Sequence, residues 1–142
     1  MHTQNQSIIV SGGSRGLGLH LVTQLLENGN KVATFARSHT TAMDELSAKY
    51  GDAFYFTPLD AVDAAGVTSF VMDVSDRFGA LDSVVNNAAI GQDQLLMHTD
   101  VDTIRRITDI NIVGPTLLTR AAIKHMMLQG GGNICSISSI CG

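Results

Sequence analysis

Residues 7–18 read Ser-Ile-Ile-Val-Ser-Gly-Gly-Ser-Arg-Gly-Leu-Gly, a short β-branched run that ends in a cluster of glycines. Gly12, Gly16 and Gly18 have the spacing Gly-x-x-x-Gly-x-Gly, and an amphipathic helical pattern follows over residues 17–26. This order predicts a strand, a tight turn and a helix N-terminus. The first amides of a helix lack partners within it and carry partial positive charge, so we expect this turn to bind phosphate. The alternative for this motif alone is a glycine-rich turn without a ligand.

The composition favours one globular domain and excludes several classes of protein. The 142 residues are 44% hydrophobic and 15% charged, as in globular α/β proteins. A net charge of -4 argues against nucleic acid as a partner, because phosphate backbones attract basic surfaces. No apolar run approaches the roughly 20 residues of a membrane helix, and residues 1–7 lack a signal-peptide pattern. Cys135 and Cys141 have no nearby histidine or further cysteine, so we expect no metal site and a reduced, cytoplasmic protein.

Strand and helix patterns alternate along the chain. The predicted strands are residues 7–10, 31–36, 53–57, 83–85 and 133–137. The predicted helices are residues 17–28, 42–50, 64–78 and 101–128, the last capped by Thr99 or Asp100. Strands joined by helices pair in parallel through right-handed crossovers. We therefore expect an α/β fold with a doubly wound, Rossmann-type parallel sheet of order 3-2-1-4-5, and a ligand at the carboxyl ends of strands one and four.

The second predicted strand ends in the sequence Phe35-Ala36-Arg37-Ser38. In dinucleotide-binding folds an acidic residue at this point accepts from the ribose 2′-hydroxyl and favours NAD. Arg37 instead offers a cation suited to a 2′-phosphate, and Arg15 in the glycine-rich turn can flank the same group. Both favour NADP(H) as the cofactor. The alternative is a pair of ordinary solvated arginines.

Polar and small residues close the third and fourth strands. Asp60 follows strand three, and its carboxylate either accepts from an adenine amino group or caps the next helix; the sequence leaves both open. Strand four runs into the sequence Asn-Asn-Ala-Ala at residues 86–89. The two alanines leave room for a cofactor, and the asparagine amides can tie neighbouring loops together. A plain turn is the alternative there.

Asn111 lies in the long predicted helix, on the same face as apolar residues at helical spacing: Ile104, Ile107, Gly114, Leu118 and Ala121. Pro115, four residues later, has no N–H, so the carbonyl of Asn111 loses its helical partner. We expect a kink here and an ordered water on that carbonyl. The alternative is a buried asparagine bonded to its neighbours. After strand five, the hydroxyls of Ser138 and Ser139 either face the ligand crevice or cap a helix.

Together these motifs resemble the short-chain dehydrogenase/reductase family, of the 3-oxoacyl-(acyl carrier protein) reductase-like kind, over the whole chain. The family pattern Thr/Ser-Gly-x-x-x-Gly-x-Gly falls on residues 11–18, and its acidic residue after strand three falls on Asp60. Its Asn-Asn-Ala-Gly falls on residues 86–89, its Asn-x-x-Gly on 111–114 and its Ile-Ser-Ser-x-x-Gly on 137–142. Ala89 departs from this pattern, since the family usually has glycine there.

The resemblance implies an NADP(H)-dependent oxidoreductase that reduces a small-molecule carbonyl compound, a 3-oxoacyl group or similar ketone, to an alcohol. The implied catalytic residues are Ser139, which would hold the carbonyl, and Asn111, which would support a proton relay through its carbonyl-bound water. The candidate cofactor-binding residues are Ser11, Gly12, Ser14, Arg15, Gly16, Leu17, Gly18, Arg37, Ser38, Asp60, Asn87, Ala88 and Ala89.

The catalytic Tyr-x-x-x-Lys of the family has no counterpart in these residues. Tyr50 and Tyr55 are followed four positions later by Phe54 and Leu59. We therefore expect residues 1–142 to be one NADP-binding domain, C-terminally incomplete and inactive alone, from a reductase that forms a dimer or tetramer. Two alternatives are a non-catalytic NADP-binding sensor of the same fold and a methyltransferase. The basic residue after strand two argues against the methyltransferase.

Overall fold

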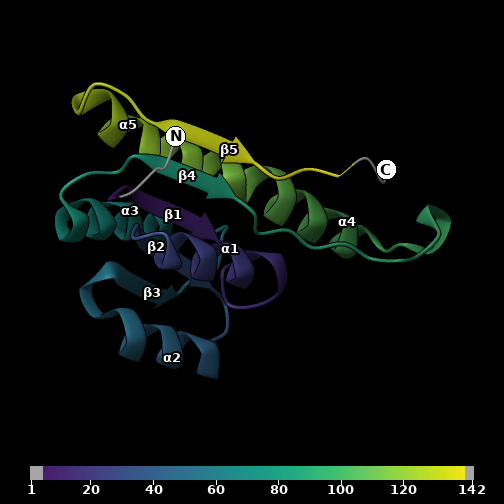
Figure 1. Ribbon diagram of the computed structural model, residues 1–142. Helices are drawn as coiled ribbons and strands as arrows, with labels where there is room; N and C mark the ends of the chain where they lie inside the picture. Colours follow the sequence, from purple (N-terminus) through teal and green to yellow (C-terminus); the bar gives the residue numbers. More distant parts are fainter. Residues whose placement is uncertain (1–4, 140–142) are drawn as a thin grey trace.

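The structure is a computed structural model that describes residues 5–139, and it contains a five-stranded parallel sheet (Figure 1). The strands are β1 (Ser7–Ser11), β2 (Lys31–Ala36), β3 (Phe54–Pro58), β4 (Ser83–Asn86) and β5 (Asn133–Ser136). They lie in the order β3-β2-β1-β4-β5, and every pair is parallel. The predicted sheet and strand order are thereby confirmed, with β5 at one edge.

Helices cover both faces of the sheet. Helices α1 (Gly16–Glu27) and α2 (Thr41–Tyr50) pack on one face, and α3 (Ala64–Phe78) and α5 (Gly114–Leu128) pack on the other. Helix α4 (Val101–Thr108) leads into α5, and short 3₁₀ helices occupy Gly51–Ala53 and Leu96–His98. Within residues 5–139, no helix combines the length and the apolar character needed to cross a bilayer.

The apolar run of β1 explains why the sheet is covered twice. Ile9 packs in the cluster of α3 and α5, whereas Ile8 and Val10 pack in the cluster of α1 and α2. Successive side chains of a strand point to opposite faces, so a continuous apolar run is buried only when both faces are covered. The strand is therefore central, and its carboxyl end opens between the two helical layers.

The single helix predicted over residues 101–128 is wrong in one respect. A π-helical turn, Asp109–Val113, separates α4 from α5. Pro115 cannot donate to the carbonyl of Asn111, so the α-helical bonding is interrupted at the place the proline indicates. The wider turn also changes the inward face, which consists of Ile110, Gly114, Leu118, Ala122 and Met126. Ile104, predicted to lie on that face, is 41% exposed.

Two exposed aspartates cap helices. Asp100 caps α4, since its Oδ1 accepts from the amide of Thr103 at 2.9 Å, which decides between the two predicted caps. Asp63 caps α3, since its Oδ1 accepts from the amide of Gly66 at 3.0 Å. Asp60 is therefore not the cap of α3, and its carboxylate is left for other contacts.

Candidate nucleotide-binding site

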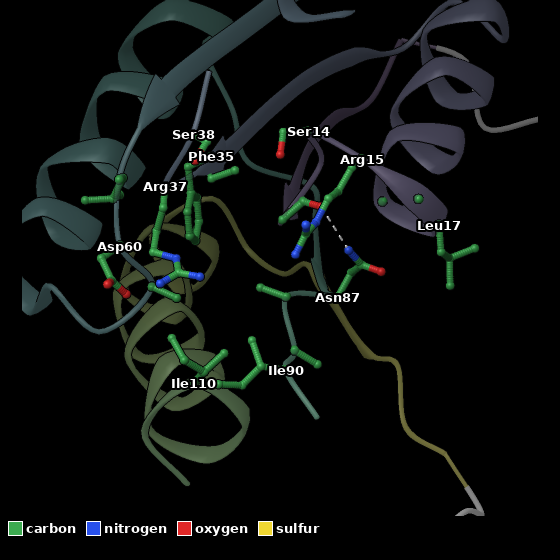
Figure 2. Close-up of a pocket in the computed structure, with 18 of the residues that line it drawn as sticks. Ser14, Arg15, Leu17, Phe35, Arg37, Ser38, Asp60, Asn87, Ile90 and Ile110 are labelled. Atoms are coloured by element: carbon green, nitrogen blue, oxygen red, sulfur yellow. Dashed lines mark hydrogen bonds between the residues drawn. The ribbon is translucent and has the colours of Figure 1, made fainter. Parts of the chain in front are cut away.

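A cavity of about 410 Å³ opens at the carboxyl ends of the central strands (Figure 2). Its lining comes from five places: the glycine loop (residues 11–18), the end of β2, the segments after β3 and after β4, and the π-helical turn. Every candidate cofactor-binding residue except Ser11 lines it. The structure thus gathers residues from four predicted motifs around one space.

The glycine loop depends on the backbone conformation of Gly12 and on close packing at Gly18. Gly12 has a φ of +72°, which side chains of L-residues rarely adopt. At Gly18, an added Cβ would collide with the carbonyl oxygen of Gly12 and lie 2.5 Å from Nδ2 of Asn87. The first turn of α1 therefore packs directly on the loop and on the end of β4. This contact aims the N-terminus of α1 at the cavity.

Hydrogen bonds of Ser11 and Asn87 connect the glycine loop to the end of β4. The Oγ of Ser11 accepts from the amides of Asn87 and Ala88, both at 3.0 Å. The Nδ2 of Asn87 donates to the carbonyl of Ser11 at 2.9 Å and to that of Gly12 at 3.3 Å. Ser11 is buried and outside the lining, so it supports the loop and does not face the cavity. The predicted role of the asparagine amide as a tie between loops is confirmed.

The N-terminus of α1 has no negative partner of its own. Arg15 occupies the N-cap position without a capping side-chain hydrogen bond, and the first turn of the helix holds no acidic residue. At α2 the hydroxyl of Thr40 likewise makes no cap, because it donates to the carbonyl of Ser14 at 3.2 Å. The amides of α1 thus remain open to an anionic group in the cavity.

Asp60 meets two arginines at the other end of the cavity. Its Oδ2 accepts from a guanidinium nitrogen of Arg106 at 2.8 Å, and its Oδ1 accepts from the amide of Val62 at 3.3 Å. Burial raises the pKa of the Asp60 carboxyl, but these hydrogen bonds and the charges of Arg106 and Arg37 outweigh it, so the pKa lies below its ordinary value. The carboxylate is therefore ionised at neutral pH and able to accept further hydrogen bonds.

Seven residues of the lining are not among those predicted from the sequence. Phe35, Ala36, Thr40, Leu59, Ala61, Ile90 and Ile110 also line the cavity. The first two directly precede Arg37 at the end of a predicted strand, so strand position was a usable signal for them. Ile110 comes from the π-helical turn, far away in sequence, and no short motif joins it to the glycine loop.

The two candidate catalytic residues lie outside the lining of the cavity. The carboxamide of Asn111 pairs with the main chain of Ile90: Oδ1 accepts from its amide and Nδ2 donates to its carbonyl, both at 2.9 Å. Asn111 thereby fixes a residue of the wall. Ser139 is exposed beyond β5. The last three residues of the predicted motif 137–142, Cys141 included, lie outside the described residues.

Comparison with known proteins agrees with this geometry. A sequence profile of the family described as short chain dehydrogenase matches residues 6–142. The chain is 34% identical to a 3alpha-hydroxysteroid dehydrogenase of Mediterraneibacter gnavus, over 99% of this chain and 58% of that protein. It is 35% identical to a 3-oxoacyl-(acyl-carrier-protein) reductase of Staphylococcus aureus, over 96% of this chain and 57% of that protein.

Solved structures agree as well. A crystal structure of a short-chain dehydrogenase from Streptomyces avermitilis superposes with a TM-score of 0.88 at 32% identity, covering 98% of this chain and 51% of that one. This protein belongs to the short-chain dehydrogenase family of oxidoreductases, whose members use nicotinamide cofactors. The chain spans a little over half the length of the relatives it matches.

Proposed function

We propose that this protein is the NADP(H)-binding part of a reductase that converts the carbonyl of a ketone, such as a 3-oxoacyl group, to an alcohol. One observation carries the choice of NADP(H): Arg15 and Arg37, from separate elements, both line the cavity beside the N-terminus of α1. A guanidinium suits a phosphate monoester because its planar donors match the oxygens of that group. An acidic residue, which would favour NAD, does not occupy the end of β2.

The residues present fit such a cofactor part by part. The uncapped amides of α1 bind the pyrophosphate, and the tight packing of Gly18 on Gly12 and Asn87 supports this by fixing the start of the helix beside the cavity. Arg37, Ser38 and Arg15 hold the 2′-phosphate, while the Asp60 carboxylate accepts from the adenine amino group. The small side chains of residues 88–89 leave room for the rest of the nucleotide. When bound, the cofactor supplies the hydride for the reduction.

We assign the orientation of the substrate and the relay of a proton to two residues. The hydroxyl of Ser139 donates a hydrogen bond to the substrate carbonyl and orients it. The carbonyl of Asn111, which Pro115 deprives of a helical donor, holds a water that passes a proton toward the site. Proton donation itself is not assigned within the 142 residues. Tyr55, in β3, stacks on Phe70 with 5.7 Å between the ring centroids, so we do not assign proton donation to it. We therefore expect the chain alone to show no turnover.

A non-catalytic NADP(H) sensor of the same fold is the second candidate. The cavity alone suffices for this function, because nucleotide binding needs no proton donor beside the ligand. The two candidates differ in one property of the full-length protein: the reductase has a tyrosine and lysine pair placed to protonate the product, and the sensor does not. Steady reduction of a ketone by the full-length protein selects the reductase.

We further propose that the protein acts in the cytoplasm as a homo-oligomer, a dimer or tetramer. The outward face of the π-helical turn and of α5 carries large apolar side chains, with Ile112 at 63% and Met127 at 76% exposure. Such a face gains free energy when a second copy covers it. Sedimentation equilibrium of the full-length protein is expected to give a dimer or tetramer, and a monomer at high concentration would contradict this.

Equilibrium titration with NADPH and NADH tests the cofactor assignment. The protein is expected to quench or shift nicotinamide fluorescence on binding, with NADPH bound at least about tenfold more tightly, as one additional charge-assisted contact provides. Equal affinity for the two nucleotides would overturn the assignment to NADP(H). No binding of either would overturn the nucleotide site itself.

A further inference from the structure

Asp60 lies between two arginines, but it pairs with only one of them. Arg106 contacts the Asp60 carboxylate at 2.8 Å, and the two side chains are 36% and 33% exposed. Arg37 is near enough for its charge to act on Asp60, and Figure 2 shows its guanidinium turned into the cavity beside that carboxylate. Among residues 5–139, however, Arg37 forms no ion pair.

The two arginines reach Asp60 from different sides. Arg37 follows β2 and lines the cavity, whereas Arg106 lies on α4 and is not part of the lining. One carboxylate oxygen, Oδ1, accepts from the Val62 amide at 3.3 Å, and the other, Oδ2, accepts from Arg106. A second guanidinium at this carboxylate would therefore compete with Arg106.

Competition for this carboxylate decides how much positive charge Arg37 offers to a ligand. An arginine paired with a carboxylate has its charge compensated and part of its donors engaged, so it binds phosphate more weakly than an unpaired arginine does. A carboxylate already held by another arginine attracts a second one less, because the local charge is balanced. With Arg106 in place, the guanidinium of Arg37 keeps its donors for an anion in the cavity.

We propose that Arg106 is a positioning residue for cofactor choice: by holding Asp60, it keeps Arg37 available for the 2′-phosphate of NADP(H). This inference rests on the proposed NADP(H) function. Arg106 is not part of the lining of the cavity. Its effect is on the ratio of affinities for NADPH and NADH, since only NADPH carries the group that Arg37 holds.

The neighbouring Arg105 provides a matched control. It lies on the same helix, is 72% exposed and pairs with Asp102, three residues earlier, at 3.2 Å. Replacing it removes the same charge from α4 without touching Asp60. Any loss of NADPH preference that arises from net charge alone therefore appears equally in Arg105→Met and in Arg106→Met.

The experiment measures dissociation constants of NADPH and NADH for the wild type, Arg105→Met, Arg106→Met and the double variant Asp60→Asn/Arg106→Met. The preference for NADPH is expected to fall about tenfold in Arg106→Met and to stay unchanged in Arg105→Met. The double variant is expected to regain the preference, because a neutral amide no longer captures Arg37. Loss of an adenine contact at Asp60 affects both nucleotides alike and cancels in the ratio.

The outcomes separate the two claims. A wild type without preference for NADPH overturns the proposed cofactor and this inference with it. A wild type that prefers NADPH, with Arg106→Met as selective as Arg105→Met, overturns the inference alone. So does a double variant that stays unselective, since Arg106 would then act on the phosphate without Asp60. Thermal melts check folding, and Arg106→Gln replaces the methionine variant if the latter is unfolded.

Discussion

The carboxamide of Asn111 makes a two-point hydrogen-bonded pair with the main chain of Ile90, 21 residues earlier in the sequence. Ile90 lines the cavity, and Asn111 lies in the π-helical turn between α4 and α5. The pair therefore connects the wall of the nucleotide site to the one irregular turn of the long helix. Both polar groups of the Asn111 carboxamide are engaged by Ile90, so the side chain does not bond the main-chain carbonyl of Asn111.

Replacing Asn111 by leucine is expected to destabilise the protein by about 2 kcal/mol, because both main-chain groups of Ile90 lose their partner in a partly buried place. Urea unfolding followed by circular dichroism measures the change. Thr108→Ala is the control, since Thr108 is exposed and bonds only within its own helix. Equal midpoints for wild type and Asn111→Leu would show that the pair contributes no stability.

Gly18→Ala is expected to weaken NADPH binding by about tenfold or more and to destabilise the fold by about 1–3 kcal/mol, as in overpacked sites. The added Cβ displaces the start of α1 from the Gly12 carbonyl and from Asn87. At Gly91 an added Cβ meets no atom within 4 Å, so Gly91→Ala is expected to change neither property. Unaltered affinity in Gly18→Ala would contradict the described role of the loop.

Asp63→Ala is expected to cost about 1 kcal/mol of stability, because α3 loses its N-cap. Asp63→Ser keeps a capping oxygen and is expected to stay close to the wild type. Neither change is expected to alter NADPH affinity, as Asp63 does not line the cavity. An alanine variant as stable as the serine variant would refute the cap.

The Asp60 carboxylate is expected to make stability depend on pH in the acid range. Its pKa is lowered in the folded state, so its contribution is complete above the ordinary aspartate pKa and disappears as the pH falls through the lowered value. Melting temperatures of wild type and Asp60→Asn, compared from pH 7 downward, should therefore converge only at strongly acid pH. A constant difference across that range would contradict the stabilising ion pair with Arg106.

Local patterns were sufficient for the sheet and for most of the lining. Strand order follows from alternating strands and helices, and the glycine loop and Arg37 each lie at a strand end that a short motif marks. The sequence leaves two roles open for Asp60, an adenine contact and a helix cap. The structure excludes the cap, because Asp63 occupies the N-cap position of α3.

Contacts between residues far apart in the sequence could not be predicted for a different reason. Arg106 and Asp60 are 46 residues apart, and their contact depends on where α4 lies relative to the end of β3. Pro115 indicated where the helix would be irregular, but not that the chain would adopt a π-helical turn. That turn separates α4 from α5, so the predicted apolar face is not continuous along one helix, and Ile104 is 41% exposed.

Heteronuclear NMR of the protein during titration with NADP⁺ tests the central claim most directly. The account predicts that the largest amide shifts fall on Gly12–Gly18, with further shifts at Arg37 and Asp60, because the pyrophosphate meets the α1 N-terminus and the 2′-phosphate meets the guanidinium. Saturable shifts elsewhere, with the glycine loop unperturbed, would contradict it.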